Sequence, residues 1–348
     1  MIANGQSSFP RVAVLVPCYN EEASVSRVVE DFRRALPEAT IYVYDNNSRD
    51  RTSEVARAQG AVVRRETLQG KGHVVRRMFA DVEADVYVLV DGDATYDAAS
   101  APAMIELLRR DGLDMITATR ISEEQAAYRR GHRFGNAMLT GLVSQIFGKR
   151  IADMLSGYRV LSRRFVKSFP AMARGFETET ELTVHALELR MPIGEVDTPY
   201  YSRPEGSFSK LSTYKDGIRI LRMIIRLVKE ERPLTFFSGA AGFLAFVAVL
   251  LAIPIVMTWL ETGLVPRIPT AILATGLVLL AFLSLTSGII LDSVGLSRRE
   301  ARRFAYLSVP GPLSLDRDGA AAVVPGNGFA SEIPTPAVPA PTSSGLAA

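Results

Sequence analysis

The sequence predicts an α/β fold built on a mostly parallel sheet, followed by an amphipathic helix and two transmembrane helices. Three observations lead to this fold class. Short hydrophobic runs alternate with amphipathic helical patterns between residues 11 and 200, as is typical of a mostly parallel sheet. Two later stretches contain no charged residue over more than the roughly 20 residues that a helix needs to cross a bilayer. Between these regions, over 211–231, apolar residues recur every three or four positions, and basic residues recur with the same spacing one position along.

The first region is expected to alternate strand and helix along the chain. The predicted strands are 12–16, 41–45, 61–65, 86–91, 115–120 and 158–162. The predicted helices are notably 22–36, 51–59, 70–81 and 99–110. No internal repeat is evident, and residues 1–210 are assigned to a single domain.

The two uncharged stretches, 236–260 and 268–291, are predicted to span a membrane. A pair of buried core helices is the alternative, but core helices seldom stay uncharged for so long. Basic residues precede the first span and follow the second, whereas the connecting loop ETGLVPR carries one arginine. The positive-inside rule therefore predicts that the N-terminal domain and both termini are cytoplasmic.

The helix predicted over 211–231 has one apolar and one basic stripe. The apolar stripe can enter the membrane interface while the basic stripe meets anionic headgroups; a solvated helix packed on the domain is the alternative. The remaining boundaries follow from composition. They give an amphipathic juxtamembrane helix at 211–234, the two spans within 235–292, a basic cytoplasmic helix at 293–306 and a disordered, Pro/Ala/Gly/Ser-rich tail at 307–348.

Composition excludes several classes of protein. The single cysteine, Cys18, rules out an intrachain disulfide and is interpreted as a small buried hydrophobic residue. The three histidines are too scattered for a zinc site. The formal net charge is only +3, and we expect no nucleic-acid partner. The short polar N-terminus predicts no signal peptide.

Polar residues follow three of the predicted strands. The segment PCYNEE (17–22) comes directly after the first strand, Asp45 ends the second, and Asp91 and Asp93 end the fourth. Ligands bind at such strand ends in a doubly wound sheet, so these groups are expected to converge in one cleft. A phosphate-binding turn would be glycine-rich, whereas PCYNEE carries an aromatic ring, an amide and two carboxylates.

The pair Asp91 and Asp93 is a candidate site for a hard divalent cation, which would neutralise a diphosphate. An Asx-type turn is the structural alternative for this pair, and a turn is the favoured interpretation of residues 46–48. The stretch Gly70-Lys71-Gly72 is not a Walker A loop. Lys71 either packs beneath a nucleotide or lies exposed on the surface.

Taken together, these motifs resemble those of family 2 glycosyltransferases, most of all the dolichyl- or polyprenyl-phosphate sugar synthases. PCYNEE, DNNSRDRT, GKG, DGDATY, DMLSGYRVLSRR and RPEGSFSKLSTYKDG occur in the family's order and approximate spacing, over about residues 11–220. The resemblance implies a Rossmann-like GT-A catalytic domain. The two spans that follow it resemble the bacterial glucosyl-transferring branch.

For the donor, the resemblance implies a nucleotide-diphosphate sugar, a UDP- or GDP-hexose. By the family pattern Pro17, Tyr19 and Glu21 hold the nucleoside and Asp45 reaches its base. The remaining donor-side residues implied are Lys71, Gly92, Asp91 and Asp93 with Mg²⁺ or Mn²⁺, and Arg203 with Lys210, which resemble a pair that clamps phosphate once a flexible loop orders.

For the acceptor, the resemblance implies a polyprenyl phosphate lipid at the membrane. Arg120 corresponds to the arginine that closes the active site, and Arg133 is a further contact for the acceptor phosphate. Asp153 is nearest to a base or acceptor-orienting role; the alternative is a carboxylate that bonds backbone or Arg159. Asp93, Asp153 and Arg120 are thus the implied catalytic residues. No chemical role is assigned to the alternating acids of FETETEL (176–182).

The sequence therefore predicts a membrane-bound transferase that moves a hexose to polyprenyl monophosphate with inversion, at the cell inner membrane. Thr95 stands where many mannosyl members have glutamine, so the sugar stays unassigned. Two alternatives remain: a transferase acting on a glycolipid or polysaccharide, and a non-catalytic scaffold that binds a nucleotide sugar. Self-association into a homo-oligomer also stays open.

Overall fold

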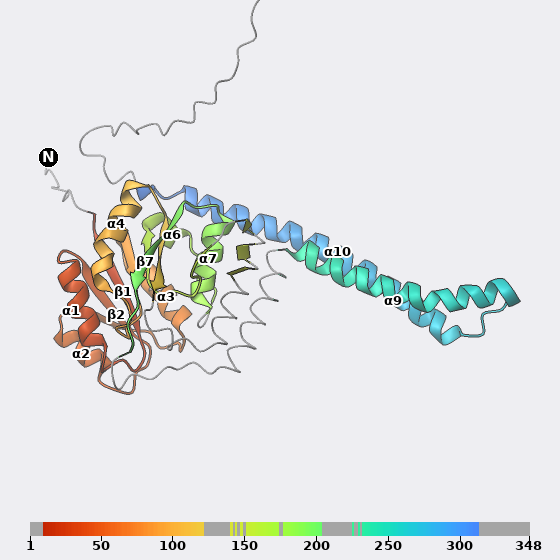
Figure 1. Ribbon diagram of the computed structural model, residues 1–348, viewed down its shortest axis with the longest axis horizontal. Helices are drawn as coiled ribbons and strands as arrows, with labels where there is room; N and C mark the ends of the chain where they lie inside the picture. Colours follow the sequence, from red (N-terminus) through yellow and green to blue (C-terminus); the bar gives the residue numbers. More distant parts are fainter. Residues whose placement is uncertain are drawn as a thin grey trace, which may run out of the picture. The chain divides into compact units, whose positions relative to one another are not determined.

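The computed structural model describes residues 10–121, 140–141, 143–144, 147–148, 151–173, 177–203, 225, 229 and 232–312. Within these residues, seven strands form one sheet in the order β3-β2-β1-β4-β6-β5-β7 (Figure 1). The strands are β1 (Val12–Cys18), β2 (Thr40–Asp45), β3 (Val62–Arg65), β4 (Val86–Leu89), β5 (Met115–Ile121), β6 (Arg159–Ser162) and β7 (Ile193–Pro199). All six predicted strands are present, and the predicted α/β class is confirmed.

The sheet is mostly parallel. β1 pairs in parallel with both β2 and β4, β2 with β3, and β5 with β7, whereas β6 runs antiparallel between β4 and β5. The seventh strand was not predicted from the sequence. β7 lies at the edge of the sheet, pairs with β5, and its sequence IGEVDTP is mostly half-buried or exposed, so it lacks the hydrophobic run that marks the central strands.

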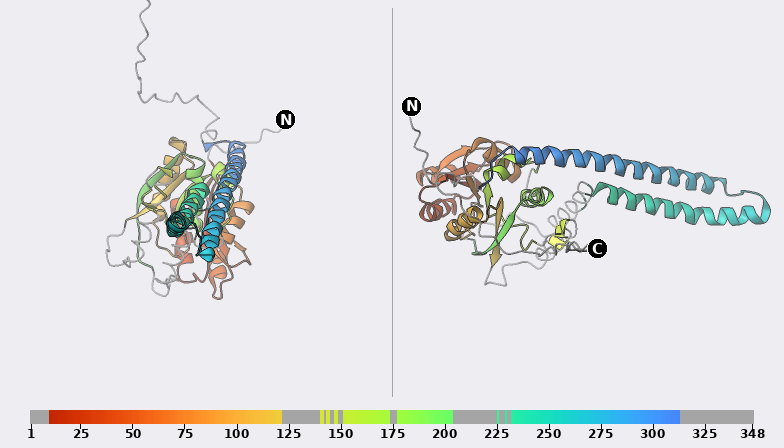
Figure 2. Two further views of the ribbon diagram at one scale, coloured as in Figure 1. Left: turned by 90° about the vertical axis from the view of Figure 1, so that its right-hand side faces the viewer. Right: turned by 90° about the horizontal axis from the view of Figure 1, so that it is seen from above.

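Helices cover both faces of the sheet (Figure 2). Side chains alternate between the two faces of a strand, so Val14 and Val16 of β1 face one helical layer while Ala13 and Leu15 face the other. The first layer contains α1 (Val25–Ala35), α2 (Thr52–Ala58) and α4 (Ala101–Arg110), the last preceded by the 3₁₀ turn η1 (Ala98–Ser100). The second contains α3 (Lys71–Asp81), α6 (Arg163–Ser168) and α7 (Thr178–Glu188).

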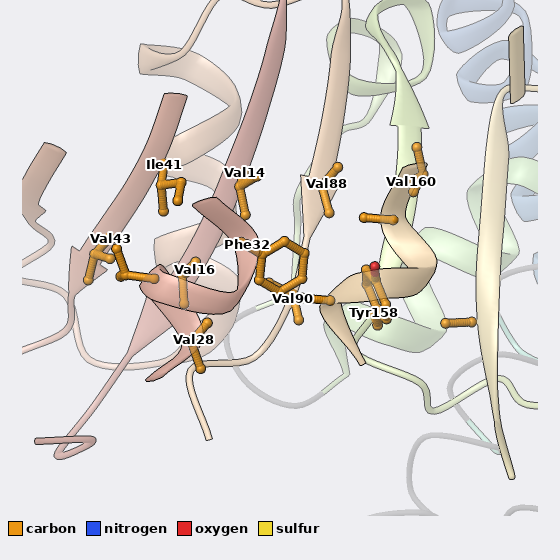
Figure 3. Close-up of a cluster of buried hydrophobic side chains, with 14 of the residues drawn as sticks. Val14, Val16, Val28, Phe32, Ile41, Val43, Val88, Val90, Tyr158 and Val160 are labelled. Atoms are coloured by element: carbon orange, nitrogen blue, oxygen red, sulfur yellow. The ribbon is translucent and has the colours of Figure 1, made fainter. Parts of the chain in front are cut away.

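The hydrophobic core between the sheet and the first helical layer contains a row of valine side chains. Val14, Val16, Val88 and Val160 project from neighbouring strands toward Phe32 of α1 (Figure 3). Phe32 meets Tyr158 edge-on, with ring centroids 5.9 Å apart. This packing fixes α1 against the strand ends and so holds the loop after β1 at the edge of the sheet.

Two long apolar helices follow the sheet domain. α9 (Pro233–Thr262) and α10 (Ile268–Leu307) lie side by side, and Ser284 Oγ donates to the carbonyl of Phe237 over 3.0 Å (Figure 1). Only 11% of the most apolar window of each helix is buried, which contradicts the buried-core alternative. Both helices are long and apolar enough to cross a bilayer, and this is compatible with membrane association.

The helix α10 is longer than the span predicted from the sequence. Its 40 residues join the predicted span 268–291 and the predicted basic helix 293–306 into one helix without a break. At 1.5 Å per residue such a helix is roughly 60 Å long, about twice the thickness of a bilayer core. Its last turns contact the sheet domain, where Tyr306 donates to Oδ2 of Asp114 over 2.9 Å.

Candidate active site

The candidate site forms where the parallel strands β1, β2 and β4 end side by side. The register places Cys18 opposite Asp45, and β4 leads directly into Asp91-Gly92-Asp93. Ser24, just after the β1 loop, donates to the carbonyl of Gly92 over 2.8 Å and lies 3.0 Å from Oε2 of Glu21. The predicted convergence of the first and fourth strand ends is therefore present.

Gly92 is the point of closest approach between these two segments. A Cβ atom built on Gly92 would lie 2.5 Å from Sγ of Cys18, well inside any normal contact distance. Cys18 itself is 2% exposed, so its interpretation as a small buried residue is confirmed. A glycine at position 92 thus lets the two aspartates emerge directly against the end of β1.

Asp93 is a buried carboxylate with a hydroxyl on one oxygen and a guanidinium on the other. Its Oδ1 accepts from the hydroxyl of Thr95 over 2.6 Å, and Arg203 lies 2.7 Å from its Oδ2. Burial, followed by the negative charge of Asp91, raises the pKa of Asp93 above the usual range of an aspartate, against the opposing effects of Thr95 and Arg203. Because burial and the charge of Asp91 both disfavour its ionised form, a cation bound beside Asp93 would stabilise that form.

Asp91 is linked to a second acid through a lysine. Lys71, the first residue of α3, contacts the carboxylates of both Asp91 and Glu179. Burial lowers the pKa of Lys71, but the two carboxylates outweigh it, so the net pKa is raised and the lysine is a permanent cation. The side chain of Lys71 is 12% exposed, so the exposed-lysine alternative is wrong. Glu179 is 7% exposed, and sequence reasoning gave it no role.

The loop before β6 lies directly against Asp91. A Cβ atom on Gly157 would lie 2.3 Å from Oδ2 of Asp91, and the N–H of Gly157 donates to the hydroxyl of Tyr96 over 2.8 Å. Arg159, which is fully buried, holds this loop by donating to the carbonyls of Met154 and Ser156. Burial lowers the pKa of Arg159 to about 10, so its guanidinium stays charged.

Arg120 and Asp153 form a two-pronged ion pair. Arg120 Nε lies 2.6 Å from Oδ2 of Asp153, and Nη2 lies 2.9 Å from Oδ1. The guanidinium also lies over the ring of Tyr200, 5.4 Å from its centroid. The predicted alternative partner of Asp153, Arg159, binds backbone carbonyls instead, although Asp153 does also accept from the backbone N–H of Leu155 over 3.2 Å.

Asp45 lies at the end of β2 and is 7% exposed. Its Oδ1 accepts from the N–H of Ser48 over 3.0 Å, and its Oδ2 accepts from the hydroxyl of Ser53 over 2.9 Å. Asn46 accepts from the N–H of Gly70 over 2.7 Å, which ties this turn to the start of α3. The turn interpretation of residues 46–48 is confirmed, and the turn positions the segment that carries Lys71.

The remaining predicted residues divide into two groups. Pro17, Tyr19 and Glu21 are half-buried at the end of β1, and the N–H of Glu21 donates to Thr52 over 2.9 Å. Arg133 and Lys210 lie outside the described residues. So do most residues of the predicted juxtamembrane helix and of the predicted tail.

The protein oxygens of this site can hold a divalent cation only if a bound substrate supplies further oxygens. Within the described part of the chain, no group of three or more His, Cys, Asp or Glu side chains gathers as a metal cage. Asp91 and Asp93 offer hard carboxylate oxygens, which suit Mg²⁺ and Mn²⁺, and a bound diphosphate would supply the further oxygens that such ions need. A cation there would also offset the burial and the neighbouring charge of Asp91 that act on Asp93.

Comparison with known proteins gives a consistent picture. The model of the family described as "Glycosyl transferase family 2" matches residues 13–169. Glycosyltransferase AglJ of Haloferax volcanii is 31% identical over 300 residues, which cover 85% of this chain and 98% of that protein. A protein of the same organism named dolichyl-phosphate hexose transferase is 29% identical over 65% of this chain and 97% of its own length.

A solved structure supports the fold. The chain matches glucosyl-3-phosphoglycerate synthase from Mycobacterium tuberculosis, solved with Mn²⁺, UDP-glucose and phosphoglyceric acid, with a TM-score of 0.52 and 22% identity. The match covers 63% of this chain and 79% of the other. At this identity the likeness is one of fold, and it agrees with the predicted GT-A architecture.

Proposed function

The chain belongs to glycosyl transferase family 2, and we propose that it transfers a hexose from a nucleotide-diphosphate sugar to a polyprenyl monophosphate, with inversion, at a membrane surface. The observation that carries the proposal is the meeting of Asp91 and Asp93 at the end of β4 with three cationic side chains around them. Lys71 contacts Asp91, Arg203 pairs with Asp93, and Arg120 is held nearby by the loop that lines Asp91. Such a site suits a reaction in which phosphate oxygens must be bound on both sides of a sugar.

On the donor side, Asp91 and Asp93 would hold Mg²⁺ or Mn²⁺. When bound, the ion supplies electrophilic stabilisation of the leaving diphosphate. Arg203 is placed to exchange its contact with Asp93 for a phosphate oxygen of the same ligand. Pro17, Tyr19, Glu21 and Asp45 lie along the same edge of the sheet, and we assign them to the nucleoside.

On the acceptor side, the proposed nucleophile is an oxygen of the lipid phosphate, which is ionised near neutral pH and needs little help from a base. Its attack forms a new bond to the anomeric carbon as the bond to the nucleotide diphosphate breaks, which inverts the anomeric configuration. Positioning and charge stabilisation then account for catalysis. Because Asp153 accepts from both Nε and Nη2 of Arg120, we assign Asp153 to orienting Arg120 toward that phosphate.

The membrane setting is part of the proposal. The helices α9 and α10 supply two apolar segments long enough to span a bilayer, and arginines follow the apolar part of α10. A cytoplasmic catalytic domain with both termini on the same side would place the site where a lipid phosphate head lies. The inner-membrane location and this orientation are therefore parts of the proposed function.

The experiment that tests the proposal separates acceptors. Purified full-length protein is incubated with a panel of labelled UDP- and GDP-hexoses, Mg²⁺ or Mn²⁺, and one of three acceptors: undecaprenyl phosphate, a glycolipid or an oligosaccharide. We expect label in the lipid extract with undecaprenyl phosphate alone, together with release of nucleoside diphosphate. Label on the glycolipid or oligosaccharide instead would favour the alternative transferases. Binding of nucleotide sugar without turnover on any acceptor would favour the scaffold.

A further inference from the structure

A hollow beside the base of the two apolar helices lies outside the site described above. Its lining includes Pro233 at the start of α9 and one face of α10. The α10 residues that line it are Leu291, Val294, Gly295, Arg298, Arg299 and Arg302. Their spacing of mostly three and four residues places them along one face of the helix.

The lining changes from apolar to cationic along α10. Leu291, Val294 and Gly295 come first, and Arg298, Arg299 and Arg302 follow within the next two turns. From Leu291 to Arg298 the helix rises roughly 10 Å. A phospholipid has the same order, with acyl chains next to a phosphate headgroup, so the hollow matches an anionic lipid in both polarity and length scale.

The charges around the hollow are unbalanced. Glu188 from α7 is the acidic residue of the lining, and it is paired with Arg302. Across the residues that the structure describes, neither Arg298 nor Arg299 forms an ion pair. A guanidinium presents parallel N–H groups that match phosphate oxygens, and basic pockets at the base of membrane helices suit anionic headgroups. The positive charge of this hollow therefore favours a phosphate group.

We infer that this hollow binds the phosphate headgroup of an anionic bilayer phospholipid, with Arg298 and Arg299 as its principal contacts. The inference rests on the membrane setting of the proposed function. The reacting lipid phosphate would belong elsewhere, since Glu188 ends α7 while Glu179, nine residues earlier, joins the active site through Lys71. Nine residues of helix separate these positions by roughly 13 Å, too far for a phosphate in the hollow to attack a sugar bound at Asp91.

The test compares the two arginines that line the hollow, Arg298 and Arg299, with a third on the same stretch of α10 that does not. Full-length protein in neutral detergent is titrated with phosphatidylglycerol, and bound lipid is counted by native mass spectrometry. Phosphatidylcholine serves as the probe without net charge and undecaprenyl phosphate as the second phosphate lipid. The variants are Arg298→Gln/Arg299→Gln and, as the control, Arg303→Gln, an exposed arginine that does not line the hollow.

We expect the wild type to prefer phosphatidylglycerol over phosphatidylcholine. Each lost arginine contact should weaken the apparent affinity about fivefold, or roughly 30-fold for the double variant. Arg303→Gln should stay close to the wild type. Equal losses in the control and the double variant would overturn the inference, because they would indicate general surface charge. Unchanged binding by the double variant would overturn it as well.

Hexosyl transfer measured on the same samples separates this inference from the proposed function. We expect the double variant to keep the wild-type KM for undecaprenyl phosphate in detergent, because the hollow is remote from Asp91. A large rise in that KM, with undecaprenyl phosphate displacing phosphatidylglycerol, would make the hollow an acceptor site and overturn the inference. A wild type that binds phosphatidylglycerol but forms no lipid-linked hexose would contradict the proposed function alone.

Discussion

Asp153 accepts two hydrogen bonds from Arg120, one to each carboxylate oxygen, at 2.6 and 2.9 Å. With both oxygens engaged by one guanidinium, the geometry of Asp153 is suited to orienting Arg120. The pair joins the end of β5 to the loop before β6, so it sets where the guanidinium lies relative to Asp91.

The first prediction concerns this pair. Asp153→Asn should lower turnover about 10- to 150-fold, the cost of a charge-assisted contact of about 1.5–3 kcal/mol, because Arg120 would no longer face a carboxylate at position 153. Nucleoside diphosphate affinity, measured by calorimetry, should change little. The control is Asp111→Asn, which removes an exposed ion pair with Arg110. If the acidic limb of the pH–rate profile disappears in Asp153→Asn, Asp153 is a general base and the positioning role is wrong.

The second prediction concerns the contact between Gly92 and Cys18. Gly92→Ala should lower turnover at least tenfold, because its Cβ would meet Sγ of Cys18 at 2.5 Å and displace both aspartates. Removing that sulfur in Gly92→Ala/Cys18→Ala should restore much of the activity, since the next atoms lie 3.5 Å away. Initial rates of the two single variants and the double variant form the cycle. Additive losses would show that the steric account is incorrect.

The third prediction concerns the link from Glu179 to Asp91. In Glu179→Gln, Lys71 keeps only Asp91 as a charged partner and should bind it more tightly, so the metal concentration at half-maximal activity should rise roughly tenfold. Glu181→Gln is the matched control, because Glu181 lies in the same turn of α7 but accepts from the backbone of Met172 and Ala173. Both variants should lose stability, and only the first should change the metal dependence. The same metal dependence in both would contradict the link.

The fourth prediction concerns acid stability. His185 is buried against Phe165 and Phe169, and burial, with a smaller effect of Arg302, lowers its pKa to about 3. A base with a lowered folded pKa binds fewer protons in the folded state than in the unfolded state once the pH drops below about 6.5. The free energy of unfolding therefore decreases as the pH is lowered. The expected loss is about 2 kcal/mol by pH 5. Thermal unfolding in detergent should show this loss in the wild type and a smaller one in His185→Gln. Parallel pH curves would exclude His185 as the cause.

The sequence predicted the central sheet because its strands are continuous apolar runs such as VAVLV and VYVLV, which a two-sided core requires. It predicted the cleft because Asp45, Asp91 and Asp93 end strands that pair in parallel through β1. β7 was missed because IGEVDTP, at the sheet edge, carries no such run.

The pairings within the site could not be predicted. Arg120 and Asp153 lie 33 residues apart, and Lys71 and Glu179 lie 108 residues apart, so nothing in local spacing indicates that they meet. Glu177, Glu179 and Glu181 alternate in the sequence, and only the packing of α7 against α3 decides which of them turns toward Lys71. What identifies Glu179 is its burial in the first turn of α7, and only a structure shows that burial.

The configuration of the anomeric carbon in the product distinguishes the proposed transfer from its alternatives. Full-length wild type and Asp93→Ala are supplied with Mg²⁺ or Mn²⁺, undecaprenyl phosphate and a ¹³C-labelled nucleotide hexose, and the anomeric coupling of the lipid product is read by NMR. We expect the wild type to form a lipid-phosphate hexose of inverted configuration and folded Asp93→Ala to form none. A product of retained configuration, or a product formed by Asp93→Ala at the wild-type rate, would contradict the proposed transfer.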